Sequence, residues 1–329
     1  MEHRMKLHEN EKLFRQAIQS TAQQRGMLDI YIEKDYWVTY AIKTVFTSDC
    51  KAYSVFKGGT ALAKCYQIIE RFSEDIDLVV LREVGESGNS LTRKIKAITD
   101  AVSQVLPQVE KKELTSKSGR LRKTAHEYPK IIKGGYGQVR DFIVVEASML
   151  GNFEPYGPME ISSYVYEMMI RQNQEALAQE YGLLPFTIQV LDIKRTLCEK
   201  IMSLVRFSYE PDPIVSLRNK IRHTYDIHKL LQLPEMQEFF NSEAFDVMLL
   251  TVGHDDIDSF RNNNEWLHNH PSKALIFRKI DEVWLQLQAT YTSTFADLVY
   301  GKLPDPLLII KDIKRVGDRL QTIEWNLEF

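Results

Sequence analysis

The most constraining feature of the sequence is the stretch Ser54–Val80, which reads S-V-F-K-G-G-T-A-L-A-K-C-Y-Q-I-I-E-R-F-S-E-D-I-D-L-V-V. Its short apolar run Val55–Phe56 predicts the end of a buried strand, and a helix-compatible segment follows at Ala61–Glu70. A polar connector, Arg71–Glu74, then leads into a second strand pattern that begins at Asp75. The order strand, glycine turn, helix, connector and strand predicts an α/β unit.

The glycine turn and the paired aspartates predict a site for a phosphate and a metal ion. Gly58 and Gly59 let the backbone approach a ligand without a Cβ atom in the way. The helix that follows points free N–H groups and its positive dipole end at that ligand, which favours an anion. Asp75 and Asp77 are two residues apart, so on a strand they project from the same face. Their mutual repulsion favours a bound cation, and carboxylate oxygens suit Mg²⁺ carried by a nucleotide.

Neither signal is specific by itself, because D-x-D is common on exposed strand ends and G-G-T before a helix is an ordinary tight turn. Together and in this order they resemble the signature of nucleotidyltransferase-fold proteins. The wording F-K-G-G-T-A-L-A-K and R-F-S-E-D-I-D-L is similar to the AbiEii/AbiGii nucleotidyltransferase toxins of type IV toxin–antitoxin and phage abortive infection systems. Glu33-Lys34-Asp35-Tyr36-Trp37-Val38 also resembles that family, although charges on a helix are otherwise typical of a solvated face with local ion pairs.

The resemblance implies an α+β fold. A nucleotidyltransferase-fold mixed sheet domain with N-terminal helices is expected at residues 1–190, and an all-α helical domain at residues 191–329. The boundary is expected near residue 190 because the pattern becomes wholly helical beyond the predicted strand Phe186–Leu191. The cleft between the domains is expected to hold the nucleotide.

The function that the resemblance implies is transfer of a nucleoside monophosphate from an NTP, with Mg²⁺, to an acceptor. By analogy the acceptor is an RNA such as the 3′ end of a tRNA, and the protein is a toxin with a cognate antitoxin as its partner. Two other functions fit the same motifs: a small-molecule nucleotidyltransferase of the aminoglycoside-modifying kind, with a compact acidic acceptor pocket, and a non-catalytic binding module. The residues assigned to nucleotide binding are Lys57, Gly58, Gly59, Thr60 and Arg222.

A third carboxylate is expected on a strand next to the D-x-D strand. The segment Phe142–Glu146 has the pattern of a strand that ends in a carboxylate. With Asp75 and Asp77 as metal ligands, Glu146 would share the second metal ion and could receive the proton of the attacking hydroxyl. The alternatives are a Glu146 that faces solvent at the strand end, and Asp141 at the strand's start as the third carboxylate.

Two C-terminal segments, E-K-I-M-S-L-V-R and R-H-T-Y-D-I-H-K-L, resemble the family motifs E-K-x-x-A-x-x-x-R and R-D/H-x-x-D, with departures at Ser203 and His223. They fall on predicted helices at 192–207 and 217–231. The resemblance implies that Lys200 and Asp226 complete the active site. Lys200 would neutralise phosphate charge as a point cation, and Asp226 would orient Lys200 or the attacking hydroxyl. Otherwise Asp226 pairs with Arg222 on the surface.

The segment Lys111–Arg140 carries a local net charge near +7 in a chain whose net charge is −3. Contact with RNA or a triphosphate is one interpretation, and sheet edges protected by basic side chains are the other. Its turn Lys133–Gly137 predicts strands on either side. The basic residues are Lys111, Lys112, Lys117, Arg120, Arg122, Lys123, Lys130, Lys133 and Arg140, and the acidic ones are Glu113 and Glu127.

The composition is ordinary for a globular protein, with 44% hydrophobic and 26% charged residues, so it does not indicate disorder. Three widely spaced cysteines, an N-terminus without a signal-peptide pattern and the lack of an apolar run of about 18 residues predict a cytoplasmic protein without membrane contact. Residues 253–272 combine aspartates and histidines. A solvated loop fits this stretch better than a zinc site, because the spacing matches no closed structural site.

Overall fold

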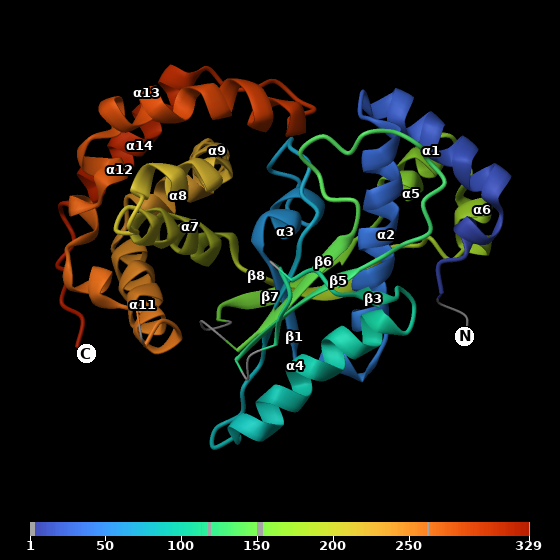
Figure 1. The fold of residues 1–329 in the computed structure, drawn as a ribbon, viewed down its shortest axis with the longest axis horizontal. Helices are drawn as coiled ribbons and strands as arrows, with labels where there is room; N and C mark the ends of the chain where they lie inside the picture. Colours follow the sequence, from blue (N-terminus) through green and yellow to red (C-terminus); the bar gives the residue numbers. More distant parts are fainter. Residues whose placement is uncertain (1–3, 113, 118–119, 150–153, 262, 329) are drawn as a thin grey trace. The chain divides into compact units, whose positions relative to one another are not determined.

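The computed structural model describes residues 4–112, 114–117, 120–149, 154–261 and 263–328. The chain divides into two compact units (Figure 1). The first, the sheet unit, contains residues up to 67, 71–149 and 156–190. The second, the helical unit, contains residues 68–70, the end of the 150–155 segment and the chain from Leu191 onward.

The sheet unit is built on one mixed sheet of eight strands in the described chain, in the order β3-β5-β6-β2-β1-β8-β7, with β4 paired to β5. Strand β2 lies antiparallel to β1 and parallel to β6, while β5 is antiparallel to β6. The strands are β1 (Ser54–Lys57), β2 (Ile76–Val80), β3 (Gln108–Val109), β4 (Ser116–Lys117), β5 (Leu121–His126), β6 (Ile143–Ser148), β7 (Tyr156–Ile161) and β8 (Phe186–Leu191).

The helices of the sheet unit begin and end at residues that suit these positions. Asn10 accepts the N–H of Leu13 at the start of α1, and Gly26 takes the left-handed conformation at its end, with φ 64°. Ser87 caps α4 by accepting the N–H of Ser90. The helices are α1 (Glu11–Arg25), α2 (Asp29–Phe46), α3 (Gly58–Lys64), α4 (Gly88–Ser103), α5 (Tyr164–Arg171) and α6 (Glu175–Glu180).

Helix α2 is the central helix of this unit, packed between α1, α4, α5 and the sheet. Sixteen of its eighteen residues are buried, including Glu33, Lys34 and Asp35. A solvated face at these three residues was therefore a wrong interpretation. Their neighbours explain why: apolar residues lie on all sides of the helix, so it has no polar face to turn toward water.

The helical unit consists of α7 (Ile193–Phe207), α8 (Pro213–Asn219), α9 (Ile221–Leu231), α10 (Pro234–Phe240), α11 (Glu243–Ser259), α12 (Leu275–Arg278), α13 (Ile280–Thr290) and α14 (Pro306–Leu320), with short 3-10 and π turns between them. The periodic apolar residues of α7 form its core face, with Leu197, Ile201 and Leu204 fully buried. The predicted α+β class is confirmed.

Several predicted boundaries were wrong. The helix after the two glycines begins at Gly58 and ends at Lys64, where Ala61–Glu70 was expected. Residues 217–231 form parts of two helices because α8 ends at Asn219. The strands expected on either side of the turn at Lys133–Gly137 are β5 and β6, which pair antiparallel and are joined by residues 127–142.

The predicted loop at 253–272 was also wrong, because α11 extends through Ser259 and a 3-10 turn occupies Glu265–His268. Within this helix Gly253 packs closely against the C-terminal segment, since a Cβ atom there would lie 2.6 Å from the ring of Trp325. Residues 275–290 form two helices, α12 and α13, which are separated at Lys279. Apolar residues of this stretch and of the turn after it are buried, among them Trp284 and Tyr291.

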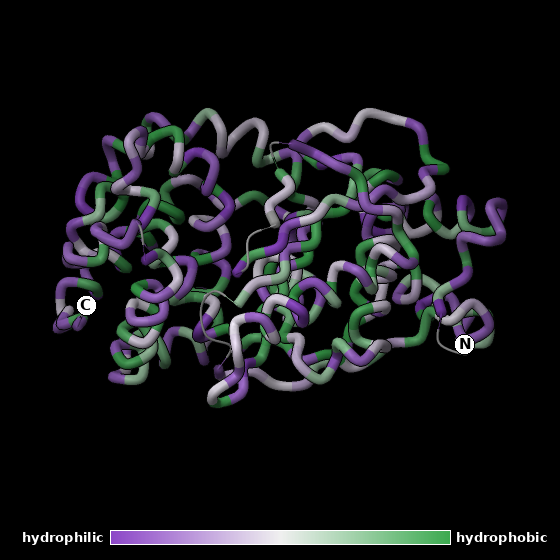
Figure 2. The backbone as a smooth tube through the Cα atoms, turned by 60° about the horizontal axis from the view of Figure 1, so that its bottom comes forward, coloured by the Kyte–Doolittle hydropathy of each residue, from purple (hydrophilic) through white to green (hydrophobic). Residues whose placement is uncertain are grey.

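Hydrophobic residues are interspersed with hydrophilic ones along both units (Figure 2). Within the described residues, every helix is too short or too polar to cross a membrane.

Candidate functional site

Three of the predicted site residues lie in one row across three neighbouring strands. Asp77 on β2 is paired in register with Lys57 on β1 and with Glu146 on β6. Paired positions on adjacent strands are about 5 Å apart, so the row places two carboxylates and one ammonium group side by side. Glu146 is not at a strand end as expected, because β6 continues to Ser148.

The outer carboxylates of this cluster each hold a basic side chain. Asp75 lies just before β2, and its Oδ1 accepts a hydrogen bond of 2.8 Å from Nη1 of Arg140. Oε2 of Glu146 accepts one of 3.0 Å from Nζ of Lys123. Asp141, the alternative third carboxylate, precedes β6 and pairs with Lys130. Asp141 therefore lies outside the row that Asp77 and Glu146 share.

The carboxyl group of Asp77 has a raised pKa because of its place in this cluster. Burial, followed by the negative charges of Glu146 and Asp75, raises the pKa of Asp77 from 3.8 to about 7, although Lys57 and Lys123 oppose the shift. A carboxyl group in this environment is stabilised by a proton or by a nearby cation. The electrostatic field thus favours a positive ligand beside Asp77.

The chemistry of the donors fits a hard divalent cation, since Asp75, Asp77 and Glu146 offer carboxylate oxygens. Among the described residues, however, no three His, Cys, Asp or Glu side chains are grouped closely enough to hold a metal ion. The pairings of Asp75 with Arg140 and of Glu146 with Lys123 account for this, because both carboxylates face a basic partner.

The two glycines have a role that the sequence did not disclose. Gly58 has φ +82°, and a Cβ atom there would overlap Oδ2 of Asp77. At Gly59 a Cβ atom would lie 2.7 Å from Nη2 of Arg71 and 2.9 Å from Oγ of Ser73. The space beside the glycines is thus filled by side chains of the 71–77 segment, where space for a ligand was expected.

Thr60 also supports the acidic segment from within the protein. Its buried hydroxyl donates a 2.6 Å hydrogen bond to the backbone carbonyl of Asp75 and lies 3.0 Å from Oγ of Ser73. These contacts fix the backbone immediately before β2. The geometry makes Thr60 a positioning residue for Asp75.

The charged residues of α2 tie four other segments of the sheet unit to this helix. Glu33 accepts the backbone N–H groups of Ile131 and Ile132. Lys34 pairs with the buried Glu74. Asp35 pairs with Lys64 of α3 and accepts the N–H of Tyr164.

Sequence reasoning missed Glu74, and it named Arg140 only as one of the basic residues of the segment Lys111–Arg140. The available signal was the apolar sequence around Lys34, because a charge in an apolar helix must be paired when buried.

The helical unit holds the other two predicted catalytic residues. Nζ of Lys200 on α7 lies 2.7 Å from Oδ2 of Asp226 on α9, and Asp226 is completely buried. The interpretation of Asp226 as half of a surface pair was therefore wrong. Arg222 lies one turn earlier on α9 and is half-buried.

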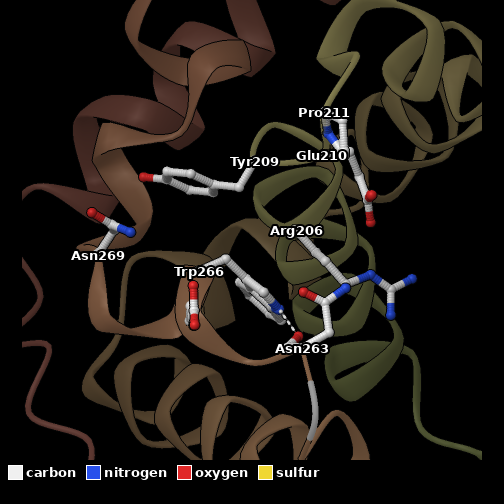
Figure 3. A pocket seen from close by; sticks show the side chains of 8 residues that line it. Arg206, Tyr209, Glu210, Pro211, Asn263, Trp266 and Asn269 are labelled. Carbon is white, nitrogen blue, oxygen red and sulfur yellow. Dashed lines mark hydrogen bonds between the residues drawn. The ribbon is translucent and has the colours of Figure 1, made fainter.

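A pocket of about 470 Å³ also lies in the helical unit. Arg206, Tyr209 and Trp266 contribute to its wall, and the indole N–H of Trp266 donates to the carbonyl of Asn263 at 3.1 Å (Figure 3). None of the predicted site residues lines this pocket.

Residues 44–321 match the family described as nucleotidyl transferase AbiEii toxin, type IV TA system. The chain belongs to the AbiEii family. The match includes the Lys57–Asp77–Glu146 row and the Lys200–Asp226 pair, so all the residues predicted for catalysis fall within the AbiEii region. Membership in a family of type IV toxins implies an antitoxin partner. No match is found among curated proteins.

Proposed function

We propose that this AbiEii chain transfers a nucleoside monophosphate from an NTP to an RNA acceptor, such as the 3′ end of a tRNA, in a Mg²⁺-dependent reaction that releases pyrophosphate. The observation that carries the proposal is the row Lys57, Asp77 and Glu146 with Asp75 beside it. Its grouped carboxylate oxygens suit the metal ion of a metal-bound triphosphate. The acceptor, the metal ion and a cytoplasmic site of action are parts of the proposal.

In this proposal Asp75, Asp77 and Glu146 would hold the metal ion through carboxylate oxygens. When bound, Mg²⁺ would neutralise phosphate charge as it develops in the transition state. Lys57 supplies a positive charge to the same row and so favours the triphosphate. Glu146 is the proposed acceptor of the proton from the attacking hydroxyl, since it lies beside Asp77 and remains about one-third exposed.

Lys200, Asp226 and Arg222 are proposed to serve the same reaction. Lys200 would neutralise phosphate charge, and the 2.7 Å contact with Asp226 holds its ammonium group in place. The buried setting of the pair supports a fixed orientation of the amine. Arg222 is proposed to bind the nucleotide through its guanidinium group.

The segment Lys111–Arg140 supports an RNA acceptor less uniformly than its composition suggests. Lys123, Lys130 and Arg140 pair with carboxylates inside the sheet unit. Arg122 donates to the hydroxyl of Thr99. Glu113 and the side chain of Lys117 lie outside the described residues. Lys112, Arg120 and Lys133 are exposed basic residues of this segment, and we propose them for contact with a polyanion.

The test is incubation of the protein with each α-labelled NTP, with total cellular RNA, and with or without Mg²⁺. Label is expected in RNA only when Mg²⁺ and the wild-type protein are both present. Asp77→Asn is the matched control, because it keeps the size of the side chain and removes its charge. A parallel incubation holds an aminoglycoside in place of RNA, and label on that aminoglycoside would favour the small-molecule alternative. No transfer under any condition would leave a binding module.

A further inference from the structure

Arg140 is held by a buried ion pair at both of its backbone polar groups. Its N–H donates to Oε1 of Glu74 at 3.2 Å, and its carbonyl oxygen accepts a hydrogen bond from Nζ of Lys34. Lys34 and Glu74 also pair directly with each other. One residue of the long 127–142 connection is thus fixed on both sides by side chains from α2 and from the segment before β2.

Burying the Lys34–Glu74 ion pair costs free energy, and the contacts with the backbone of Arg140 give this burial a role. Lys34 is completely buried and Glu74 is nearly so, and burial lowers the pKa of Lys34 and raises that of Glu74. Removing two opposite charges from water often costs as much as their attraction returns, so an apolar pair would serve stability equally well. The pair does one thing that an apolar pair cannot: it binds the backbone of residue 140.

The result of this anchoring is the position of the Arg140 side chain. Its Nη1 lies 2.8 Å from Oδ1 of Asp75 and 3.3 Å from Oε1 of Glu74. About one-third of the guanidinium side chain is exposed, as is 27% of the Asp75 side chain. The cation therefore lies on a carboxylate that the proposed reaction needs for a metal ion, and it can be reached from solvent.

We propose that Arg140 is an exchangeable cation of the active site. Without substrate it neutralises Asp75. When a divalent cation with its nucleotide takes Asp75, the guanidinium group of Arg140 binds the triphosphate. Lys34 and Glu74 are positioning residues that hold Arg140 at this place. The inference rests on the proposed function, because it assigns a further substrate-binding residue to the same site.

The planar guanidinium group suits this exchange. It can donate to carboxylate oxygens and to phosphate oxygens with the same forked geometry. Lysine would provide the charge without the fork, so Arg140→Lys is expected to retain part of the effect. Asp75 and the triphosphate are both anions. When Arg140 moves from Asp75 to the triphosphate, the divalent cation takes its place on Asp75, so no charge is left unpaired.

The test measures the binding of Mn²⁺ alone and of Mn²⁺ with an α,β-methylene NTP, for wild type and Arg140→Ala, without any acceptor. Mn²⁺ binding is followed by the electron paramagnetic resonance of the free ion, and nucleotide binding by calorimetry. Arg140→Ala removes a competing cation, so affinity for Mn²⁺ alone should rise several-fold. It also removes a phosphate ligand, so nucleotide affinity should fall about tenfold or more. Lys94→Ala, which breaks the 2.8 Å pair with Glu86 elsewhere in the sheet unit, is the matched control and should change neither affinity.

Opposite changes in the two affinities support the exchange. If both affinities fall, Arg140 is merely structural and the exchange is overturned. It is equally overturned if neither affinity differs from that of Lys94→Ala. A wild-type protein that binds neither Mn²⁺ nor nucleotide would instead overturn the proposed function, and with it the exchange.

A separate double variant tests whether Lys34 and Glu74 position Arg140. Lys34→Met combined with Glu74→Met replaces the buried charges by apolar side chains of similar length, and thermal unfolding checks that the protein folds. Nucleotide affinity should fall by a factor similar to that of Arg140→Ala, because the guanidinium group is no longer held. A folded double variant with wild-type nucleotide affinity would contradict the positioning role.

Discussion

The ion pairs made by the proposed catalytic residues differ in burial between the two units. In the sheet unit, Arg140–Asp75 and Lys123–Glu146 leave 27–33% of each side chain exposed. In the helical unit, Lys200 is 7% exposed and Asp226 not at all. An exposed pair contributes about 0–1 kcal/mol and can exchange its partner for a ligand, while removing one partner of a buried pair strands a charge. The same residue types thus make a replaceable set of cations in one unit and a fixed pair in the other.

The largest expected effect is on catalysis in the sheet unit. Asp75→Ala and Asp77→Ala should each lower the rate of nucleotide transfer by about 10³-fold or more, because each removes a proposed metal ligand. The fold should remain, since neither variant strands a buried cation. Transfer is measured with labelled NTP, and circular dichroism checks the fold. A folded variant that transfers nucleotide at the wild-type rate would remove that residue from the metal site.

In the helical unit the large effect should be on stability. Lys200→Met leaves Asp226 buried without its cation and should lower the free energy of unfolding by about 3–5 kcal/mol. Lys123→Ala, which opens an exposed pair in the sheet unit, should cost at most about 1 kcal/mol. Urea unfolding measures both. The contrast between the units fails if the two variants lose the same stability.

Lys200→Met combined with Asp226→Leu should recover most of the loss, since no buried charge then lacks a partner. A double variant no more stable than Lys200→Met would show that packing, and not the stranded charge, causes the loss.

A smaller catalytic effect separates the two candidates for the third carboxylate. Glu146→Gln should reduce the transfer rate by about 10²-fold, because it removes a base and a metal ligand beside Asp77. Asp141→Asn is the matched control and should leave the rate near that of wild type, since Asp141 lies before β6 and pairs with Lys130. If Asp141→Asn shows the larger loss, the third carboxylate is assigned to the wrong residue.

The raised pKa of Asp77 predicts a pH dependence of stability for the metal-free protein. Its pKa is about 7 in the folded state against an ordinary 3.8, so the folded state holds an extra proton between these values. The free energy of unfolding should therefore fall as pH rises from about 4 to 7, by at most about 1.4 kcal/mol per pH unit from this group. Asp77→Asn should lack this contribution. Urea unfolding in chelator at several pH values measures the difference, and identical curves would contradict the raised pKa.

The smallest effect is expected at the exposed basic residues. Lys112, Arg120 and Lys133 changed together to Glu should weaken RNA binding and reduce the slope of log affinity against log salt by roughly 0.7–0.9 per lost contact. Nucleotide affinity should hardly change, because exposed charges beyond about 10 Å are largely screened at 0.1 M salt. RNA affinity is measured over a salt series and nucleotide affinity at one salt concentration. An unchanged slope would mean that these residues do not contact RNA.

The local elements of the site and the family could be predicted from the amino-acid sequence alone. The strand at Val55–Phe56, the turn at the two glycines and the strand from Asp75 follow from alternation and turn residues within a few positions. The same sequence motifs indicated the AbiEii family, and the match over residues 44–321 confirms this family. Helix boundaries were less accurate, because packing partners such as Trp325 against Gly253 are distant in the chain.

Which charged side chains form pairs could not be predicted from the sequence, because it depends on strand register and on the packing of distant segments. The pairing of Asp77 with Glu146 depends on the register of β2 against β6, and a shift of one residue would turn Glu146 to the other face. The burial of Lys34 with Glu74 and of Lys200 with Asp226 depends on which elements pack together. Periodicity reports the environment of a residue along its own helix or strand. The free energy of a charge depends on its burial and on its partner, and both come from segments far away in the chain.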